Sequence, residues 1–558
     1  MKKKGLLVVI VLLAVGLVFG GLYATRNLGK SSKTVSSEEA LRKLTNYVNR
    51  IDPAEGSPVK STVEMRGGDS TFQELPDLTD GSIAVRESTS LYAEIFASSE
   101  KTGAGTDGWL REMASAFNAS GAQVNGQPCS VRVRTVSSGQ QVDYVASGKY
   151  VPAAISPSSS LSVKMLNAKG VATEDAAASL VMNYAGIVLS SSAYSTLTEE
   201  YGAATVETLA KATADDKLIM GYTNPFTSAT GFNFLVTLLD SSAPGAILSE
   251  KATAGFIAFQ RNVPFVAMTT TQLRSAADKG TFGAFVMEYQ AFLADKNLSR
   301  NYRFVPFGYA HENPLAMVAS APADQKEVLR QFAAFCRASG GSLAEQDGFN
   351  TMPEGWTAPS NEYDGETLIA AQELYKENKD TKPIIAVFVA DVSGSMVGEP
   401  INTLRSSLVN AMQYINEENY IGLVSYNDTV TVELKPEQFD LTQQSLFKGT
   451  VESLSVGGAT ATFDALCVAM KLVNDKMAEV PEAKPMIFVL SDGETNRGYS
   501  LNDVRDIVSG LQMPVYTIGY NANISALSEL SDINEGVCIN AGTDDITYQL
   551  RQLFNANM

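Results

Sequence analysis

Short apolar runs and amphipathic segments alternate along most of the chain after residue 81. In the first series, apolar runs predict strands at Leu91–Ala97, Val131–Val136 and Ala153–Ile155. Segments with helical spacing of apolar residues, Trp109–Phe117 and Val142–Ser147, lie between and after these strands. Such alternation predicts an α/β fold with a mostly parallel sheet and helices on its faces.

A second α/β series runs from Lys382 to Met558. It opens with Ile384–Ala390, which is apolar at every position, as expected for a strand that helices cover on both faces. Further strands and helices alternate after it, up to a helix predicted at Asp545–Phe554. The pattern therefore predicts two α/β regions in one chain.

The N-terminus has the pattern of a membrane anchor. Lys2, Lys3 and Lys4 precede an uncharged run from Gly5 to Thr25, which is long enough for a helix to cross a bilayer. The lysines should stay in the cytoplasm, so the body of the protein should lie outside the cell at a single-pass membrane anchor. A signal peptide cleaved near residue 24 is the alternative.

These patterns divide the chain into five parts. Ser36 and Glu39 form a capping box for a short helix within an otherwise Gly- and Pro-interrupted stalk. A second Pro- and Gly-rich stretch, with one helix, separates the two α/β regions. The expected parts are an anchor at 1–26, a stalk or linker at 27–80, an α/β region at 81–350, a connector at 351–381 and a terminal domain at 382–558.

Composition excludes several classes of function. The 558 residues carry a net charge of -18, so the chain is a poor candidate for binding nucleic acid. With one histidine, His311, it cannot build a zinc site from several histidines. We expect His311 to be a surface or hinge residue. No His-based triad, reactive Cys motif, phosphate loop or paired carboxylates point to an enzyme, and we expect none.

The four cysteines contain no C-x-x-C pair. Cys336 and Cys467 lie on apolar helix faces and should be small core residues. A disulfide between Cys467 and Cys538 would be compatible with an extracellular location, but the sequence does not establish it.

The most informative polar residues follow apolar strands of the terminal domain. Asp391, Ser393 and Ser395 come directly after the first of these strands, and Asp492 follows a later one. Thr460 lies in a third loop, before a helix. Loops at the carboxyl ends of parallel strands meet at one sheet edge, where ligands bind. Carboxylate and hydroxyl oxygens suit a hard divalent cation: Mg²⁺ first, with Ca²⁺ and Mn²⁺ as alternatives.

The order D-V-S-G-S-M, G-x-T-x-x-x-D and L-S-D-G in this region resembles the von Willebrand factor A family with its metal-ion-dependent adhesion site. The resemblance covers 382–558 and implies a Rossmann-like fold with a central, mostly parallel sheet. It also implies that the five oxygen-bearing residues hold a metal whose open coordination position is completed by a carboxylate of a protein partner. Asp464, one turn into its helix, is expected to give structural support.

Hydroxyl-rich loops follow several strands of the 81–350 region. Ser98-Ser-Glu-Lys, Asn224-Pro and Asp347-Gly-Phe occur in an order that resembles bacterial extracellular solute-binding proteins of the two-lobed type II periplasmic fold. Hydroxyls and backbone N–H groups at helix starts can hold a polar or negative ligand without a cation. The candidate ligand-binding residues are Ser98, Ser99, Ser138, Ser158 and Thr227.

Two functions follow from these features. The first is a membrane-anchored bacterial surface protein that recognises a protein partner through a divalent cation and carries a solute-binding-like module. The alternative is a transport-associated or sensory receptor whose 81–350 cleft binds a small oxyanion or polar solute.

Overall fold

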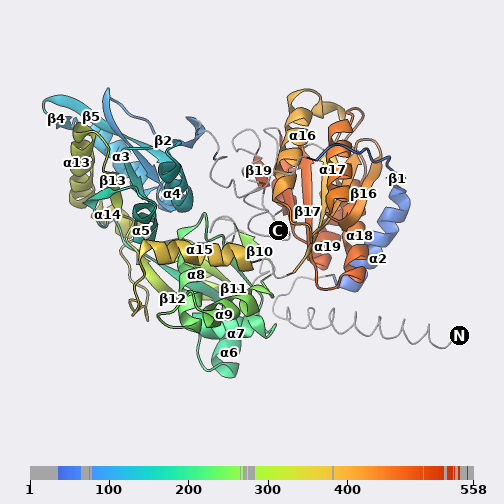
Figure 1. Ribbon diagram of the computed structural model, residues 1–558, viewed down its shortest axis with the longest axis horizontal. Coiled ribbons are helices and arrows are strands. Elements are labelled where there is room, and N and C mark those ends of the chain that lie inside the picture. Colours follow the sequence, from blue (N-terminus) through green and yellow to red (C-terminus); the bar gives the residue numbers. More distant parts are fainter. Residues whose placement is uncertain are drawn as a thin grey trace. The chain divides into compact units, whose positions relative to one another are not determined.

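The computed structural model describes two compact units. One of them is formed by two separate segments of the chain, and the other lies between these segments in the sequence. Residues 35–63 belong with Lys382–Leu550 in one discontinuous unit, and the residues between them form a two-lobed unit (Figure 1). The residues described are 35–63, 75, 78, 80–263, 265–267, 273, 283–379, 382–493, 495–520, 525–531, 533, 538–540 and 550.

The first lobe of the two-lobed unit is built on a sheet in the order β2-β5-β3-β6-β13-β7. Its strands are β2 (Ile83–Val85), β3 (Leu91–Ala97), β5 (Gln127–Thr135), β6 (Ala154–Ser156), β7 (Thr173–Ala177) and β13 (Leu315–Val318). Its helices are α3 (Trp109–Ala119), α4 (Ser138–Ser147), α5 (Ser160–Ala168), α13 (Ala323–Ser339) and α14 (Gly341–Gln346). Strand β3 pairs in parallel with β5 and β6, whereas β2 and β13 pair antiparallel with their neighbours.

The second lobe has a five-stranded sheet in the order β10-β9-β11-β8-β12. Its strands are β8 (Asn183–Ser190), β9 (Met220–Thr223), β10 (Phe265–Ala267), β11 (Ala284–Glu288) and β12 (Tyr302–His311). Its helices are α6 (Ser191–Glu200), α7 (Val206–Ala214), α8 (Ala229–Ser242), α9 (Glu250–Gln260), α11 (Tyr289–Ala294) and α12 (Lys296–Asn301). Strand β8 is antiparallel to both β11 and β12. The expectation of mostly parallel sheets in this region is therefore wrong, because returning strands make both sheets mixed.

The expected connector is part of the two-lobed unit. Its helix α15 (Gly365–Asn378) packs on α5 of the first lobe and on α8 and α9 of the second. The chain thus leaves this unit along a helix that touches both lobes.

The discontinuous unit surrounds a seven-stranded sheet in the order β1-β16-β15-β14-β17-β18-β19. Its strands are β14 (Ile384–Asp391), β15 (Tyr420–Tyr426), β16 (Val430–Gln438), β17 (Lys484–Ser491), β18 (Val515–Gly519), β19 (Cys538–Asn540) and the short β1 (Ala54–Glu55). The helices are α2 (Ser37–Ile51), α16 (Glu399–Ala411), α17 (Leu441–Ser453), α18 (Thr462–Glu479), α19 (Leu501–Leu511) and α20 (Ser525–Ser531). Only β15 and β16 pair antiparallel, so this sheet is mostly parallel as expected.

Helix α2 lies inside the predicted stalk but packs on the discontinuous unit, against α18 and α19 (Figure 1). Ser36 caps it by accepting a hydrogen bond from the Glu39 amide, which is one of the two hydrogen bonds of the predicted capping box. A Cβ atom placed on Gly510 of α19 would lie 2.7 Å from the Cβ of Ala40, so glycine permits the close approach of the two helices. The ring of Tyr47 stacks on that of Tyr499, with centroids 4.0 Å apart.

The residues after α2 continue along the same unit. Strand β1 pairs with β16, and the following segment runs beside α17. The amide of Val59 donates to Thr450 Oγ1 (3.1 Å), and Ser445 Oγ donates to the carbonyl of Ser61 (2.6 Å). The expectation of a free stalk at 27–80 therefore fails for residues 35–63, which complete the discontinuous unit.

Among the described residues, no helix is both long and apolar enough to cross a membrane. The predicted anchor at 5–25 and, apart from Leu550, the predicted helix at Asp545–Phe554 lie outside the described residues. None of the four cysteines forms a disulfide in the structure, and Cys336 and Cys467 are buried as expected.

Candidate functional site

The carboxyl end of β14 fixes the first carboxylate of the predicted metal site. All eight positions of β14 are buried, and Asp391 at its end is 0% exposed. One carboxylate oxygen of Asp391 accepts from the Ser393 amide (2.8 Å). The other accepts from Ser491 Oγ (2.6 Å) and from the hydroxyl of Tyr426 (3.2 Å). Neighbouring strands thus hold this carboxylate in place from both sides.

The two serines of the motif lie side by side. Ser393 Oγ and Ser395 Oγ are 3.0 Å apart, and Ser393 is buried whereas Ser395 is exposed. The amide of Gly394 between them donates to the carbonyl of Gly458 (3.0 Å), which joins this loop to the loop of Thr460. The site therefore opens to solvent on the side of Ser395.

The Thr460 loop is tied to the last loop of the site. The Thr460 amide donates to Asn496 Oδ1 (2.9 Å), and the Asn496 amide donates to the Thr460 carbonyl (3.1 Å). Gly458 has a φ of +85°, and a Cβ there would lie 2.2 Å from a carboxylate oxygen of Asp428. Only glycine fits this turn, which presents Thr460 to the same sheet edge as Asp391.

Asp492 is buried without a hydrogen-bond partner. It follows β17, which pairs with β14 along its length, and it is 3% exposed. Neither of its carboxylate oxygens has a partner among the described residues. Burial raises the pKa of Asp391, hydrogen bonds from Ser491 and Ser393 act against this, and the charge of Asp492 raises that pKa further. Two buried carboxylates thus repel each other across this edge.

A cation fits this arrangement. An unpaired buried carboxylate is costly, and proteins pair such groups or use them to bind metals. In the described ranges, no group of three His, Cys, Asp or Glu side chains could hold a metal ion. The candidate site here differs from such a group, because it has two carboxylates and its other donors are hydroxyls. Oxygen donors alone suit a hard divalent cation. The five residues predicted from the sequence are therefore brought together at one sheet edge.

Asp464 has the supporting role expected of it. One of its carboxylate oxygens accepts from the amide of Tyr499 (2.7 Å), and burial raises its pKa. A Cβ on Gly498 would lie 2.4 Å from this carboxylate. Asp464 thus fixes the loop that leads into α19.

In the two-lobed unit, three of the five candidate serine and threonine residues come together. Ser138 Oγ lies 3.2 Å from Ser158 Oγ, and Ser158 Oγ lies 3.3 Å from Ser98 Oγ. The other two candidates lie apart from this cluster. Ser99 is exposed, and Thr227 Oγ1 donates to the carbonyl of Asn224 within its own turn (3.4 Å).

Sequence reasoning missed the charged residues beside these hydroxyls. Glu100 and Lys101 follow Ser98 and Ser99 directly, so adjacency to the hydroxyl loop was the available signal. Lys101 Nζ also donates to Asn313 Oδ1 (3.0 Å), a contact across 212 positions that no local pattern reveals.

His311 is buried, so the expectation of a surface position is wrong. Its Nδ1 lies 2.8 Å from Glu288 Oε1, which also accepts from the hydroxyl of Thr230 (2.5 Å). Burial alone would lower the pKa of His311, but the charge and hydrogen bond of Glu288 outweigh it and raise that pKa.

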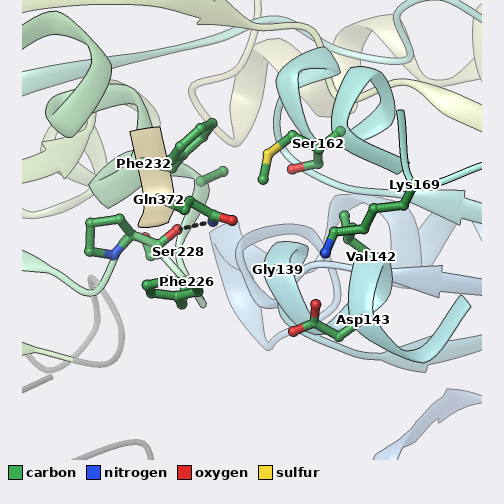
Figure 2. Close-up of a pocket in the computed structure, with 12 residues that line it drawn as sticks. Gly139, Val142, Asp143, Ser162, Lys169, Phe226, Ser228, Phe232 and Gln372 are labelled. Atoms are coloured by element: carbon green, nitrogen blue, oxygen red, sulfur yellow. Dashed lines mark hydrogen bonds between the residues drawn. The ribbon is translucent and has the colours of Figure 1, made fainter. Parts of the chain in front are cut away.

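The lobes touch directly, and the pocket between them is small. The amide of Gly139 on α4 donates to the carbonyl of Thr227 in the second lobe (3.2 Å), and a Cβ on Gly139 would lie 1.7 Å from the carbonyl oxygen of Phe226. Figure 2 shows the adjoining pocket, where Gln372 of α15 donates to the carbonyl of Pro225 (2.9 Å). Its cavity volume of about 20 Å³ holds roughly one water molecule.

Two families match separate parts of the chain. Residues 386–556 match the von Willebrand factor type A domain. Residues 102–350 match the bacterial extracellular solute-binding protein family. The two matched ranges correspond to the sheet with the metal-site residues and to the two-lobed unit.

Individual relatives are distant. Inter-alpha-trypsin inhibitor heavy chain H3 of Mesocricetus auratus is 29% identical over 163 residues, which cover 27% of this chain and 18% of that protein. The chain thus spans about a fifth of the length of the curated relatives it matches. A periplasmic thiamin binding protein is 13% identical, with a TM-score of 0.39 over 52% of this chain and 96% of its own. A von Willebrand factor type A protein from Catenulispora acidiphila is 17% identical, with a TM-score of 0.29 over 32% and 43%.

Proposed function

We propose that this chain is a bacterial surface protein that recognises a protein partner through a divalent cation, held by Asp391, Ser393, Ser395, Thr460 and Asp492. Its activity is binding and not catalysis. The observation that carries the proposal is the Asp492 carboxylate, which is 3% exposed and has no hydrogen-bond partner among the described residues. We expect a hard divalent cation, Mg²⁺ first with Ca²⁺ and Mn²⁺ as alternatives, because all the donors are oxygen atoms.

The residues of the proposed cation site have different roles. Asp391 and Asp492 supply the negative charge, and Ser491 and Tyr426 orient the Asp391 carboxylate through their hydroxyls. When bound, the cation would offer its open coordination position to a carboxylate of the partner.

The rim of the site offers an apolar contact to a partner. Val397 follows the motif and is 62% exposed, whereas Met396 beside it is buried. More than half of a typical protein interface is non-polar area, to which an exposed aliphatic side chain can contribute. We therefore expect Val397 to contribute to partner binding without contributing to cation binding.

The attachment of α2 supports a surface role. Ser37 Oγ at the start of α2 donates to the carbonyl of Gly510, which lies just before β18 begins, at the sheet edge opposite the metal-site residues. Residues 26–36 connect this point to the proposed anchor at 5–25 and span at most about 40 Å. A tether of this length would allow an anchored protein to present its metal site away from the membrane.

Recovery of a partner tests the proposal. Tagged wild type, Asp391→Ala and Asp475→Ala are incubated with surface extracts in Mg²⁺ or in EDTA. Asp475 is the matched control, because its side chain is 54% exposed and pairs only with Lys471 on the same helix. A partner recovered by wild type and by Asp475→Ala in Mg²⁺, but not in EDTA and not by Asp391→Ala, supports the proposal. Recovery that ignores both EDTA and the Asp391 substitution contradicts it.

A receptor for a small polar solute is the second candidate. The convergence of Ser98, Ser138 and Ser158 favours it, together with the family match of residues 102–350. Calorimetric titration of the full chain with oxyanions and small metabolites tests this function separately, because it requires no partner protein and no divalent cation.

A further inference from the structure

The three converging serines surround a carboxylate of the protein itself. Ser98 Oγ and Ser158 Oγ both donate to Glu100 Oε1, the latter at 2.6 Å. Ser138 Oγ lies 3.2 Å from Ser158 Oγ and accepts from the Ser158 amide (3.1 Å). The hydroxyls therefore form a short chain of donors that ends on the Glu100 carboxylate.

A buried cation completes this arrangement. Lys101 is 0% exposed, and its Nζ donates to Ser98 Oγ (2.5 Å), Asn313 Oδ1 (3.0 Å) and Glu100 Oε1 (3.4 Å). Burial lowers the pKa of Lys101, and the charge of Glu100 acts against that effect. Burial alone would raise the pKa of Glu100, but the charge of Lys101 and the hydrogen bonds from Ser158 and Ser98 outweigh it.

The groups around Glu100 are those that recognise a free oxyanion. Hydroxyl donors, a buried ammonium group and the start of a helix all favour a negative charge. Helix α4 begins at Ser138, so its N-terminal end lies beside this cluster. The Glu100 carboxylate occupies the place that these donors offer to an anion.

We propose that Glu100 is an intramolecular ligand that fills an oxyanion site of the first lobe, so that a free carboxylate or tetrahedral oxyanion binds only where Glu100 is absent or withdrawn. The inference is independent of the metal site and of partner recognition. It predicts that the wild-type cleft rejects oxyanions, because an incoming anion would meet the Glu100 charge. The inference therefore leaves an uncharged or cationic polar solute, and not an oxyanion, as the ligand of the second candidate function.

Acetate is a probe for the vacated site, since it carries the carboxylate that Glu100→Ala removes. Both tryptophans of the chain lie in the two-lobed unit, so their fluorescence during thermal unfolding reports on that unit. We expect Glu100→Ala to lower the unfolding temperature, because it removes the carboxylate that contacts the buried Lys101 ammonium group. Acetate should restore that temperature in the variant and leave the wild type unchanged.

Calorimetric titrations with acetate and sulfate supply the affinity. We expect Glu100→Ala to bind at least one of these anions about tenfold or more tightly than wild type, because a like charge in the site opposes binding. Glu362→Ala is the control for anion binding elsewhere, since that side chain is 85% exposed, and it should behave as wild type. Glu100→Gln keeps the shape of the side chain and serves as a second variant in case Glu100→Ala does not fold. It should show a smaller increase in anion affinity than Glu100→Ala.

The proposal is overturned if wild type binds these anions as tightly as the variants, or if neither Glu100 variant gains binding. Equal gains in Glu362→Ala would show adventitious binding only and would also overturn it. The anion titrations require neither the divalent cation nor the protein partner. A negative result in them is therefore distinguishable from a negative result in the partner-recovery experiment.

Discussion

The docking of α2 predicts that a single substitution in the supposed stalk destabilises a sheet more than 300 positions away in the sequence. Leu44 is 0% exposed and lies in the same hydrophobic core as Ile487 and Val504 of the discontinuous unit. Replacing a fully buried leucine by alanine costs about 3 kcal/mol, from lost transfer free energy and from the cavity left behind. Leu44→Ala should lower the free energy of unfolding of the discontinuous unit by this amount.

Hydrogen exchange of the full chain measures this loss within one unit. For amides that exchange through unfolding of the whole unit, about 3 kcal/mol corresponds to roughly a hundredfold faster exchange. We expect this acceleration in peptides that cover β14 and β17. Tryptophan fluorescence during urea unfolding reports on the two-lobed unit and should not change.

Leu441→Ala is the matched control, because it makes the same chemical change in the same unit at a side chain that is 52% exposed. Its effect should stay within about 0.5 kcal/mol. If Leu44→Ala changes the exchange of β14 and β17 no more than Leu441→Ala does, then residues 35–63 are a stalk and the assignment of a discontinuous unit is wrong.

Three further predictions concern packing, thiol reactivity and pH. Gly510→Ala should destabilise the discontinuous unit by about 1 to 3 kcal/mol in the same exchange assay, because the new Cβ would lie 2.7 Å from the Cβ of Ala40. Burial raises the pKa of Cys336 to about 12, so iodoacetamide should leave this thiol unmodified in the native chain and alkylate it only after unfolding, as read by peptide mass spectrometry. Burial and then the charge of Glu112 raise the pKa of Asp347 to about 6, so the native state holds a proton that the unfolded state has already lost. Asp347 should therefore contribute a loss of stability to the two-lobed unit as pH rises from about 4 to 6, measured as the difference between wild type and Asp347→Asn in urea unfolding followed by tryptophan fluorescence.

The grouping of the candidate metal-site residues was predictable because the parts are local. Each donor follows an apolar strand or precedes a helix, and parallel strands bring their carboxyl ends to one edge. The Asp391 motif and the apolar strand before it are read directly from the sequence. The structure adds that Asp492 has no hydrogen-bond partner among the described residues, which depends on the packing around it and not on its neighbours in the chain.

The boundaries of the units were not predictable in the same way. Helix α2 shows its capping box in the sequence, but its buried positions are Ala40 and Leu44 alone, a pattern too short to separate a docked helix from an exposed one. Its partner surface includes Gly510, which lies far along the chain. Helix α17 was missed as well, because the apolar positions of Leu441–Ser453 do not follow a clear helical period.

The occupied anion site also depends on tertiary structure. Hydroxyl-rich loops after strands indicate an anion site in the sequence, and Ser98, Ser138 and Ser158 do converge. The path of one short loop directs the Glu100 carboxylate toward these hydroxyls, and the sequence pattern does not reveal that path. Lys101 contacts Asn313, which lies 212 positions away in the sequence, so no local sequence pattern predicts this contact.

The most direct test of the account is a calorimetric titration of the full chain with Mg²⁺ after treatment with EDTA and removal of the chelator. We expect a saturable binding isotherm for wild type and for Asp475→Asn. We expect that isotherm to be lost in Asp492→Asn, which keeps the shape of the side chain and removes its charge. Equal Mg²⁺ binding by Asp492→Asn and wild type, or no binding by wild type, would contradict the assignment of the metal site.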